Sequence, residues 1–247
     1  MLRELDKPKA QRVLDAAEIR LFDIRAPKTR LPKRAHFVRG DIRSYPQVRK
    51  ACQGVDLVLH TAALISWGQH SAGALQGVNV QGSRNVISAC AENEVRALVY
   101  SSSLDAVYDG TDTLDGDETQ PYPQRFYGDY PRTKALAEQE VLAADGRPWN
   151  SGTGHLRCTA VRPCGMWGEG DPYHIGQLLR IAKQGKLLFR MGNGRALFQH
   201  LYVGNAAHGH LMAARPLLEP EARAGGQVVG WWLVTRRCVQ GTFLCLP

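Results

Sequence analysis

Short apolar runs alternate with longer segments of helical period along most of this chain. Such alternation is typical of parallel strands joined by crossover helices, and it predicts an α/β fold. The expected strands are 19–23, 36–41, 55–60, 95–100 and 158–162, and the expected helices are 44–54, 79–93 and 130–144. In the last helix we expect Glu138 and Glu140 to point outward. With 247 residues, 44% of them hydrophobic, the chain is long enough for a single α/β domain with one sizeable core.

Residues capable of chemistry stand where several of the expected strands end. Asp23 ends the first strand, Asp41 ends the second, and Ser101 to Ser103 follow the strand 95–100. Ligands in open α/β sheets bind beyond the carboxyl ends of the strands. We therefore expect a functional site at this edge of the sheet.

A tyrosine and a lysine four residues apart begin the helix expected over 130–144. Pro131 suits the first helical turn, where its missing N–H costs nothing, and Tyr130 and Lys134 then share one face. An ammonium beside a phenol favours the phenolate and brings a reference pKa of about 10 towards working pH. An isolated pair of this kind is more often a solvated helix face. Here the serine run upstream favours proton transfer to or from a substrate oxygen.

The charge and the cysteine pattern exclude several classes of protein. The net charge of +8 suggests anionic partners, but the 31 lysines and arginines are dispersed, so we expect no nucleic-acid binding. The six cysteines form no C-x-x-C pair, and the charged start lacks the apolar core of a signal peptide. No apolar run approaches the ~20 residues of a membrane span. We expect an intracellular protein that is cytoplasmic or peripheral to a membrane.

Two other chemistries lack their usual sequence signals. His200, His208 and His210 have no second cluster of ligands to complete a metal site, so we expect no metal. Serine hydrolases of the α/β type expose their nucleophile on a G-x-S-x-G turn, and the chain contains none.

Ordered blocks of sequence between residues 19 and 230 identify a family resemblance. The blocks are Asp41-Ile42, His60-Thr-Ala-Ala63, Val78 to Asn85, Val99 to Ser103, Tyr130 to Glu138 and Arg162 to Gly168. Together they resemble the extended short-chain dehydrogenase/reductases, and within them the 3β-hydroxysteroid dehydrogenase/isomerase and sterol 4α-carboxylate 3-dehydrogenase branch. The resemblance implies a Rossmann-like doubly wound parallel sheet, NAD rather than NADP as cofactor, and oxidation of a steroid or sterol CH–OH group. A homodimer and association with the endoplasmic reticulum membrane are compatible with it.

The resemblance also implies roles for the residues of the expected site. Tyr130 would exchange a proton with the substrate oxygen, and Lys134 would bind the nicotinamide ribose and lower the pKa of Tyr130. Ser103 would hydrogen-bond the substrate oxygen as its charge changes. Ser101 and Ser102 fit this role less well, because serines at a strand end commonly cap exposed backbone groups.

Further residues would border the cofactor. Asp23 would accept hydrogen bonds from the adenosine ribose, which favours NAD because a carboxylate repels the extra phosphate of NADP; Arg25 could instead pair with that phosphate. The resemblance places Asp41 and Ile42 beside the adenine, Ala62 and Ala63 beside the pyrophosphate and ribose, and Pro163, Gly165 and Met166 beside the nicotinamide carboxamide. Asn79 resembles an asparagine of the family's central helix, and a helix-start cap is the alternative.

The two ends of the chain depart from the family pattern. Residues 1–18 are polar and contain no glycine, so the expected first strand and its G-x-x-G-x-x-G phosphate loop are missing. That strand is central in a doubly wound sheet, so its loss would expose the strands beside it. We expect a Rossmann-like domain over 19–230, with substrate-side elements from about 163, and a divergent tail over 231–247. The alternative to an active dehydrogenase is a truncated, catalytically impaired relative that acts as a binding protein.

Overall fold

The computed structural model describes residues 14–66, 69–111, 113, 116–171, 175–186, 198–219 and 227–229. The tail predicted over 231–247 and most of the N-terminal segment lie outside the described residues. The strands are β1 (Ile19–Asp23), β2 (Ala35–Arg39), β3 (Leu57–His60), β4 (Ala97–Ser101), β5 (Arg157–Val161), β6 (Gly165–Trp167), β7 (His200–Tyr202) and β8 (Gln227–Val229). The helices are α2 (Tyr45–Ala51), α3 (Ala72–Leu75), η2 (Gln76–Gln81), α4 (Gly82–Glu92), η3 (Leu104–Ala106), α5 (Asp129–Ala143), α6 (Ile175–Lys183) and α7 (Val203–Leu217).

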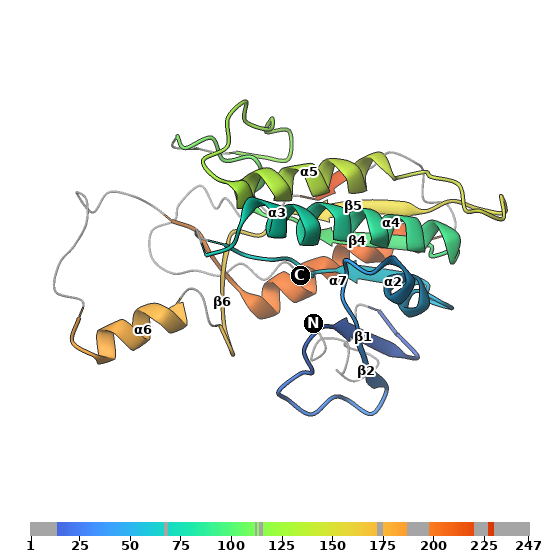
Figure 1. Ribbon diagram of the computed structural model, residues 1–247, viewed down its shortest axis with the longest axis horizontal. Coiled ribbons are helices and arrows are strands. Elements are labelled where there is room, and N and C mark those ends of the chain that lie inside the picture. Colours follow the sequence, from blue (N-terminus) through green and yellow to red (C-terminus); the bar gives the residue numbers. More distant parts are fainter. Residues whose placement is uncertain are drawn as a thin grey trace.

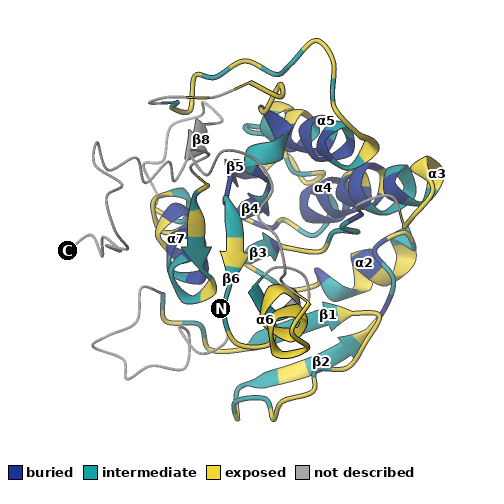
Figure 2. Cartoon of the chain, turned by 90° about the vertical axis from the view of Figure 1, so that its left-hand side faces the viewer, coloured by how far each residue is buried: buried dark blue, intermediate teal, exposed yellow. Residues whose placement is uncertain are grey.

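A parallel sheet in the order β3-β4-β5-β8 forms the centre of the fold. Because β4 and β5 are covered on both faces, nearly all of their residues are buried. Leu98 and Cys158 face the core formed with α4 and α5, whereas Val99 and Val161 pack with residues of α7. Figure 2 shows this arrangement, with α7 on one side of the sheet and α4 and α5 on the other. The predicted α/β class and parallel strands are confirmed.

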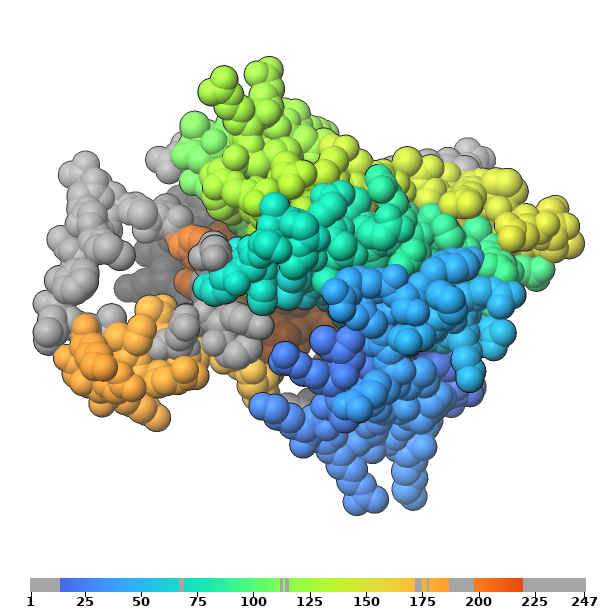
Figure 3. Space-filling view, viewed as in Figure 1, coloured from blue at the N-terminus to red at the C-terminus, as the bar shows by residue number. Residues whose placement is uncertain are grey.

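Helices α2, α4 and α5 lie side by side over one face of the sheet (Figures 1 and 3). The middle helix is longer than the sequence predicts. It begins at Ala72, because the Ser71 hydroxyl accepts a hydrogen bond from Ala74 N at 3.3 Å and caps the first turn. It then passes through the π-helical turn η2 before it continues as α4.

The strands β1 and β2 form a separate parallel pair, with Ile19 opposite Ala35. Arg20 ties this pair to the end of α2, because its Nη1 atom donates to Ala51 O at 2.7 Å and to Gln53 O at 2.9 Å. Among the described residues, β1 pairs with β2 and β3 pairs with β4, and no strand joins β1 to β3. In a doubly wound sheet a central strand occupies the position between two such strands.

The elements β6, α6, β7 and α7 follow β5 along the chain. Strands β6 and β7 pair in parallel, and Gly165 is the first residue of β6. Gly168 follows with φ of +152°, and a Cβ atom there would lie 2.4 Å from Val203 Cγ1. Only glycine fits this close approach. In the parts of the chain that the structure describes, no helix has the length and apolar character needed to cross a membrane.

Candidate active site

The carboxyl ends of β4 and β5 stay together beyond the strands themselves. Ser102 N donates to Val161 O at 2.7 Å, and Leu104 N donates to Pro163 O at 3.0 Å. These bonds hold Ser103 beside the chain that leaves β5. Ser103 has extended backbone with φ of −155°, is buried, and caps the 3-10 helix η3.

Lys134 is buried in the second turn of α5 and points at the end of β4. Its Nζ atom donates to Ser101 O at 2.6 Å and lies 4.2 Å from the centroid of the Tyr100 ring. Burial lowers the pKa of Lys134 to about 7, and the charge of Glu138 opposes this shift. Sequence reasoning placed Lys134 on a face shared with Tyr130 but could not place it over the Tyr100 ring.

Tyr130 lies in the first turn of α5, where Pro131 is buried. Burial raises the pKa of Tyr130 to about 12; the charge of Asp105 raises it further, and a hydrogen bond with Ser103 lowers it. The protein groups therefore keep the phenol protonated at neutral pH, in contrast to the lowering predicted from Lys134. The reason is that burial dominates, and that the Lys134 ammonium is directed at the Ser101 carbonyl.

Asn79 joins the loop after β3 to α5. Its Oδ1 atom accepts from Leu64 N at 2.7 Å, and its Nδ2 atom donates to Leu64 O at 3.1 Å and to Thr133 Oγ1 at 3.0 Å. Thr133 in turn donates to Tyr130 O at 2.9 Å. Asn79 lies within η2 and not at a helix start, so the capping alternative is wrong. Single π-helical turns inside helices are frequent at functional sites.

His60 is a buried neighbour of this cluster to which sequence reasoning gave no role. Ser83 Oγ donates to Asn79 O at 2.6 Å and lies 2.9 Å from His60 Nε2, so the histidine nitrogen is the donor in that contact. Burial and the charge of Lys134 lower the pKa of His60 to about 3, which keeps the ring neutral. A histidine at the end of an apolar strand was the available sequence signal.

A buried ion pair lies on the face of α5 that carries Tyr130 and Lys134. Arg162 Nη2 lies 2.6 Å from Glu138 Oε1, and the side chains of Glu138 and Arg162 are 0% and 3% exposed. Tyr122 OH donates to the same carboxylate at 2.7 Å. The outward position predicted for Glu138 is wrong, because Tyr130, Lys134 and Glu138 follow at steps of four and share the inward face. Glu140 is partly exposed, as predicted.

The residues expected at the cofactor lie in three parts of the fold: at the ends of β1 and β2, in the loop after β3, and after β5 into β6. Asp23 is exposed at the end of β1, and its Oδ1 accepts from Arg25 N at 2.8 Å. Asp41 follows β2 and pairs with Arg43, which lowers the pKa of the carboxyl group. Ile42 is buried against α4. In the loop after β3, Ala62 is exposed and Ala63 is half-buried. Pro163 is buried after β5, and Gly165 and Met166 lie in β6. Contacts join Pro163 to the segment after Ser103, whereas Asp23 ends β1 and Asp41 follows β2 in the separate strand pair.

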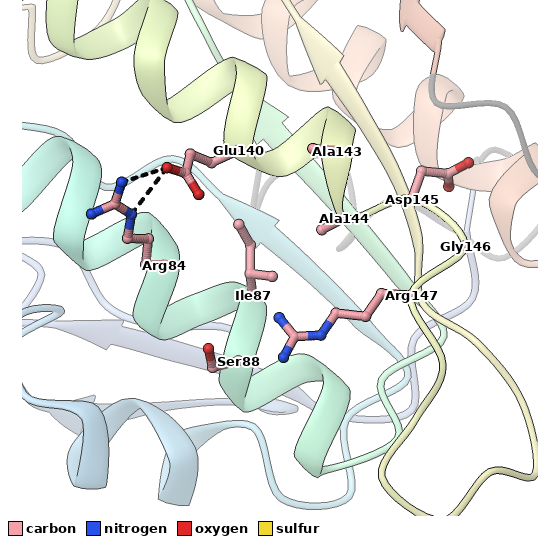
Figure 4. Close-up of a pocket in the computed structure, with 9 residues that line it drawn as sticks. All are labelled: Arg84, Ile87, Ser88, Glu140, Ala143, Ala144, Asp145, Gly146 and Arg147. Atoms are coloured by element: carbon pink, nitrogen blue, oxygen red, sulfur yellow. Dashed lines mark hydrogen bonds and ion pairs between the residues drawn. The ribbon is translucent and has the colours of Figure 1, made fainter.

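A hollow of about 480 Å³ lies between α4 and α5 (Figure 4). It is lined by Arg84, Ile87, Ser88, Glu140 and residues 143–147, and Arg84 pairs with Glu140 across it. These residues of α5 belong to its last turns, away from Tyr130, so the hollow contains no predicted site residue. Within the described residues, no group of three histidine, cysteine, aspartate or glutamate side chains is arranged to hold a metal ion.

Comparison with known proteins identifies the family and the fold of this chain. The family model of the 3-beta hydroxysteroid dehydrogenase/isomerase family matches residues 10–230. Short-chain dehydrogenase/reductase family 42E member 1 of Danio rerio is 36% identical over 217 residues, which cover 86% of this chain and 56% of the relative. The 3beta-hydroxysteroid-dehydrogenase/decarboxylase isoform 1 of Arabidopsis thaliana is 39% identical over 78% of this chain and 44% of that protein. The chain thus spans about half the length of these relatives.

A solved structure shares the fold. It is DesIV, a dTDP-glucose 4,6-dehydratase from Streptomyces venezuelae with NAD and TYD bound, at a TM-score of 0.71 and 22% identity. The match covers 88% of this chain and 67% of that one. The family model covers most of the chain and contains the blocks around Ser103, Tyr130 and Lys134. On this ground the chain belongs to the 3-beta hydroxysteroid dehydrogenase/isomerase family.

Proposed function

We propose that this chain carries the acid/base site of a dehydrogenase that uses NAD to oxidise a 3β-hydroxyl group of a steroid or sterol. The observation that carries the proposal is the meeting of Tyr130, Lys134 and Ser103 at the carboxyl end of β4. Ser103 lies close enough to Tyr130 to lower the pKa of its phenol, and Lys134 contacts the carbonyl of Ser101, two residues before Ser103.

In the proposed oxidation, the phenolate of Tyr130 accepts the proton of the substrate hydroxyl group, and Ser103 hydrogen-bonds the substrate oxygen. NAD, when bound, supplies the acceptor for the hydride that leaves the carbinol carbon. Because the pKa of Tyr130 is raised to about 12, its phenol is ready to donate a proton to a ketone at neutral pH. Oxidation requires the phenolate instead, so its rate is expected to rise with pH through the alkaline range.

The residues on the expected cofactor path are compatible with NAD. Asp23 has a second carboxylate oxygen beside the one that accepts from Arg25 N, and ribose hydroxyls are suitable donors to it. Ala62 and Ala63 have side chains small enough for a ligand to approach the backbone after β3. The negative charge of Asp23 supports NAD over NADP.

The substrate class rests on relatedness. The Arabidopsis thaliana relative is called a 3beta-hydroxysteroid-dehydrogenase/decarboxylase, which supports a steroid or sterol with a 3β-hydroxyl group. Peripheral association with a membrane of the endoplasmic reticulum, and formation of a homodimer, stay predictions.

One observation favours a second candidate, a binding protein without dehydrogenase activity. Among the described residues, no strand joins β1 to β3. Asp23, expected at the ribose, ends β1, whereas Tyr130, expected at the substrate, begins α5 over the other sheet. In related α/β folds the strand at such a position leads into the phosphate loop.

Isothermal calorimetry with NAD distinguishes the two candidates. The full chain is compared with the same chain carrying a family-type first strand and glycine-rich turn at its N-terminus, and each form is also made with Tyr130→Phe. Micromolar NAD binding by the unmodified chain, with turnover of a 3β-hydroxysteroid that Tyr130→Phe abolishes, is the expected result. Binding by the grafted form alone supports the second candidate for this chain. No binding by either form contradicts the NAD proposal.

A further inference from the structure

A carboxylate lies next to Ser103, and the proposed reaction gives it no role. Asp105 is two residues further along, in η3, and faces back to the serine. Ser103 Oγ donates to Asp105 Oδ2 at 3.2 Å and accepts from Asp105 N at 3.2 Å. A hydroxyl group has a single proton to donate. In this arrangement Asp105 therefore holds the Ser103 proton, and it competes for that proton with Tyr130 and with a substrate oxygen.

The second oxygen of the same carboxylate holds another hydroxyl. Tyr127 OH donates to Asp105 Oδ1 at 2.6 Å. Tyr127 lies three residues before Tyr130, and its ring meets Tyr108 edge-on, with the centroids 5.6 Å apart. Tyr127 is 51% exposed and Tyr108 37% exposed, so this aromatic pair stands at the solvent side of the site. Asp105 thus connects the acid/base group with the segment that precedes α5.

We propose that Asp105 is a positioning residue. One of its carboxylate oxygens fixes the direction of the Ser103 hydroxyl, and the other anchors the segment around Tyr127 against the site. The importance of Ser103 rests on the proposed function, but the two contacts do not. A substrate oxygen is bound by Ser103 only when it draws the serine proton away from Asp105, so the carboxylate holds the serine in one orientation until the substrate arrives.

The negative charge of Asp105 also acts on Tyr130, because it favours the protonated form of the phenol. After burial, it is the largest cause of the raised pKa of Tyr130. Among the described residues, Tyr100 from β4 and Tyr127 from the preceding segment also interact with Tyr130. From α5 itself, Lys134 lies one turn further along, and Asp129 and Arg132 flank Tyr130 and pair with each other at 3.0 Å. Burial raises the pKa of both Tyr100 and Tyr127, so they stay neutral near pH 7. Asp105 is an acidic group that raises the pKa of Tyr130, so its removal is expected to lower that pKa.

The test compares Asp105→Asn with Tyr127→Phe in the full chain, with the tyrosines labelled by carbon-13 at Cζ. The Tyr130 signal is assigned from its loss in Tyr130→Phe. In Asp105→Asn the charge is gone and the serine proton is less strongly held, so the ionised fraction of Tyr130 at pH 10 is expected to rise about threefold or more. In Tyr127→Phe the carboxylate remains, and the titration of Tyr130 is expected to stay in place.

Hydrogen exchange measures the anchoring contact separately. Both variants are expected to speed amide exchange over residues 116–128, because each removes or weakens the bond between Tyr127 and Asp105. Asp105→Ser is a second charge-removing variant, and it decides the titration if Asp105→Asn does not fold. An unchanged Tyr130 titration without the charge overturns the effect on the acid/base group, and unchanged exchange overturns the anchoring. Neither readout needs cofactor or substrate, so failure here is distinct from failure to bind NAD.

Discussion

The buried pair of Glu138 and Arg162 offers a sharp test of how the active-site helix is held. We expect Glu138→Gln to destabilise the protein by about 3–5 kcal/mol, because it leaves the Arg162 charge buried without a counter-charge. The two side chains are 0% and 3% exposed, so solvent does not compensate for the loss. A domain has a total stability of roughly 5–15 kcal/mol, so this single change removes a large part of it.

The same helix provides the matched control. Glu140 pairs with Arg84 at 2.5 Å, but these side chains are 38% and 48% exposed (Figure 4). The chemically identical change Glu140→Gln is therefore expected to cost about 0–1 kcal/mol. Urea unfolding at pH 7, followed by circular dichroism, gives both free energies of unfolding from the midpoints and slopes.

A double variant tests whether the loss comes from the unpaired charge. Adding Arg162→Met to Glu138→Gln removes the charge as well as its partner. We expect the double variant to be more stable than the sum of the two single changes predicts, since the side chains contact each other. Equal losses for Glu138→Gln and Glu140→Gln, within about 1 kcal/mol, would refute the argument from burial.

Other expected outcomes concern Lys134, two glycines and Asn79. Folding lowers the pKa of Lys134 from an ordinary 10.5 to about 7. Between these pH values the unfolded chain binds more protons than the folded protein, so the free energy of unfolding increases as pH rises. A Lys134→Met variant should lack this increase in unfolding experiments from pH 7 to 10. Gly82→Ala would place a Cβ 2.8 Å from Ile42 Cγ2 and should cost about 1–3 kcal/mol, while Gly73→Ala, with open space around it, should be neutral or stabilising in the same thermal unfolding assay. Asn79→Ala removes the partner of both the N–H and C=O of Leu64, so amide exchange at Leu64 should accelerate; protection equal to that of the wild type would contradict the bridging role.

The sequence by itself determined the class of fold and the order of its elements. Apolar runs such as 95–100 are strands because a parallel sheet covered on both faces needs nearly continuous apolar residues. The spacing of Tyr130 and Lys134 on one helix, after the serines of β4, also follows from local pattern. These features depend on neighbours along the chain, and the sequence contains that information directly.

Only the tertiary structure decided which polar groups are buried and what they contact. Glu138 has the same side chain as Glu140, yet it is fully buried, because Arg162 from the end of β5 and Tyr122 reach it across long distances in sequence. The pKa of Tyr130 rises rather than falls, since burial outweighs the effect of the lysine one turn away. Asp105 meets Tyr127 only because the segment before α5 returns to the end of β4. Charge and burial depend on such long-range contacts, which no local spacing specifies.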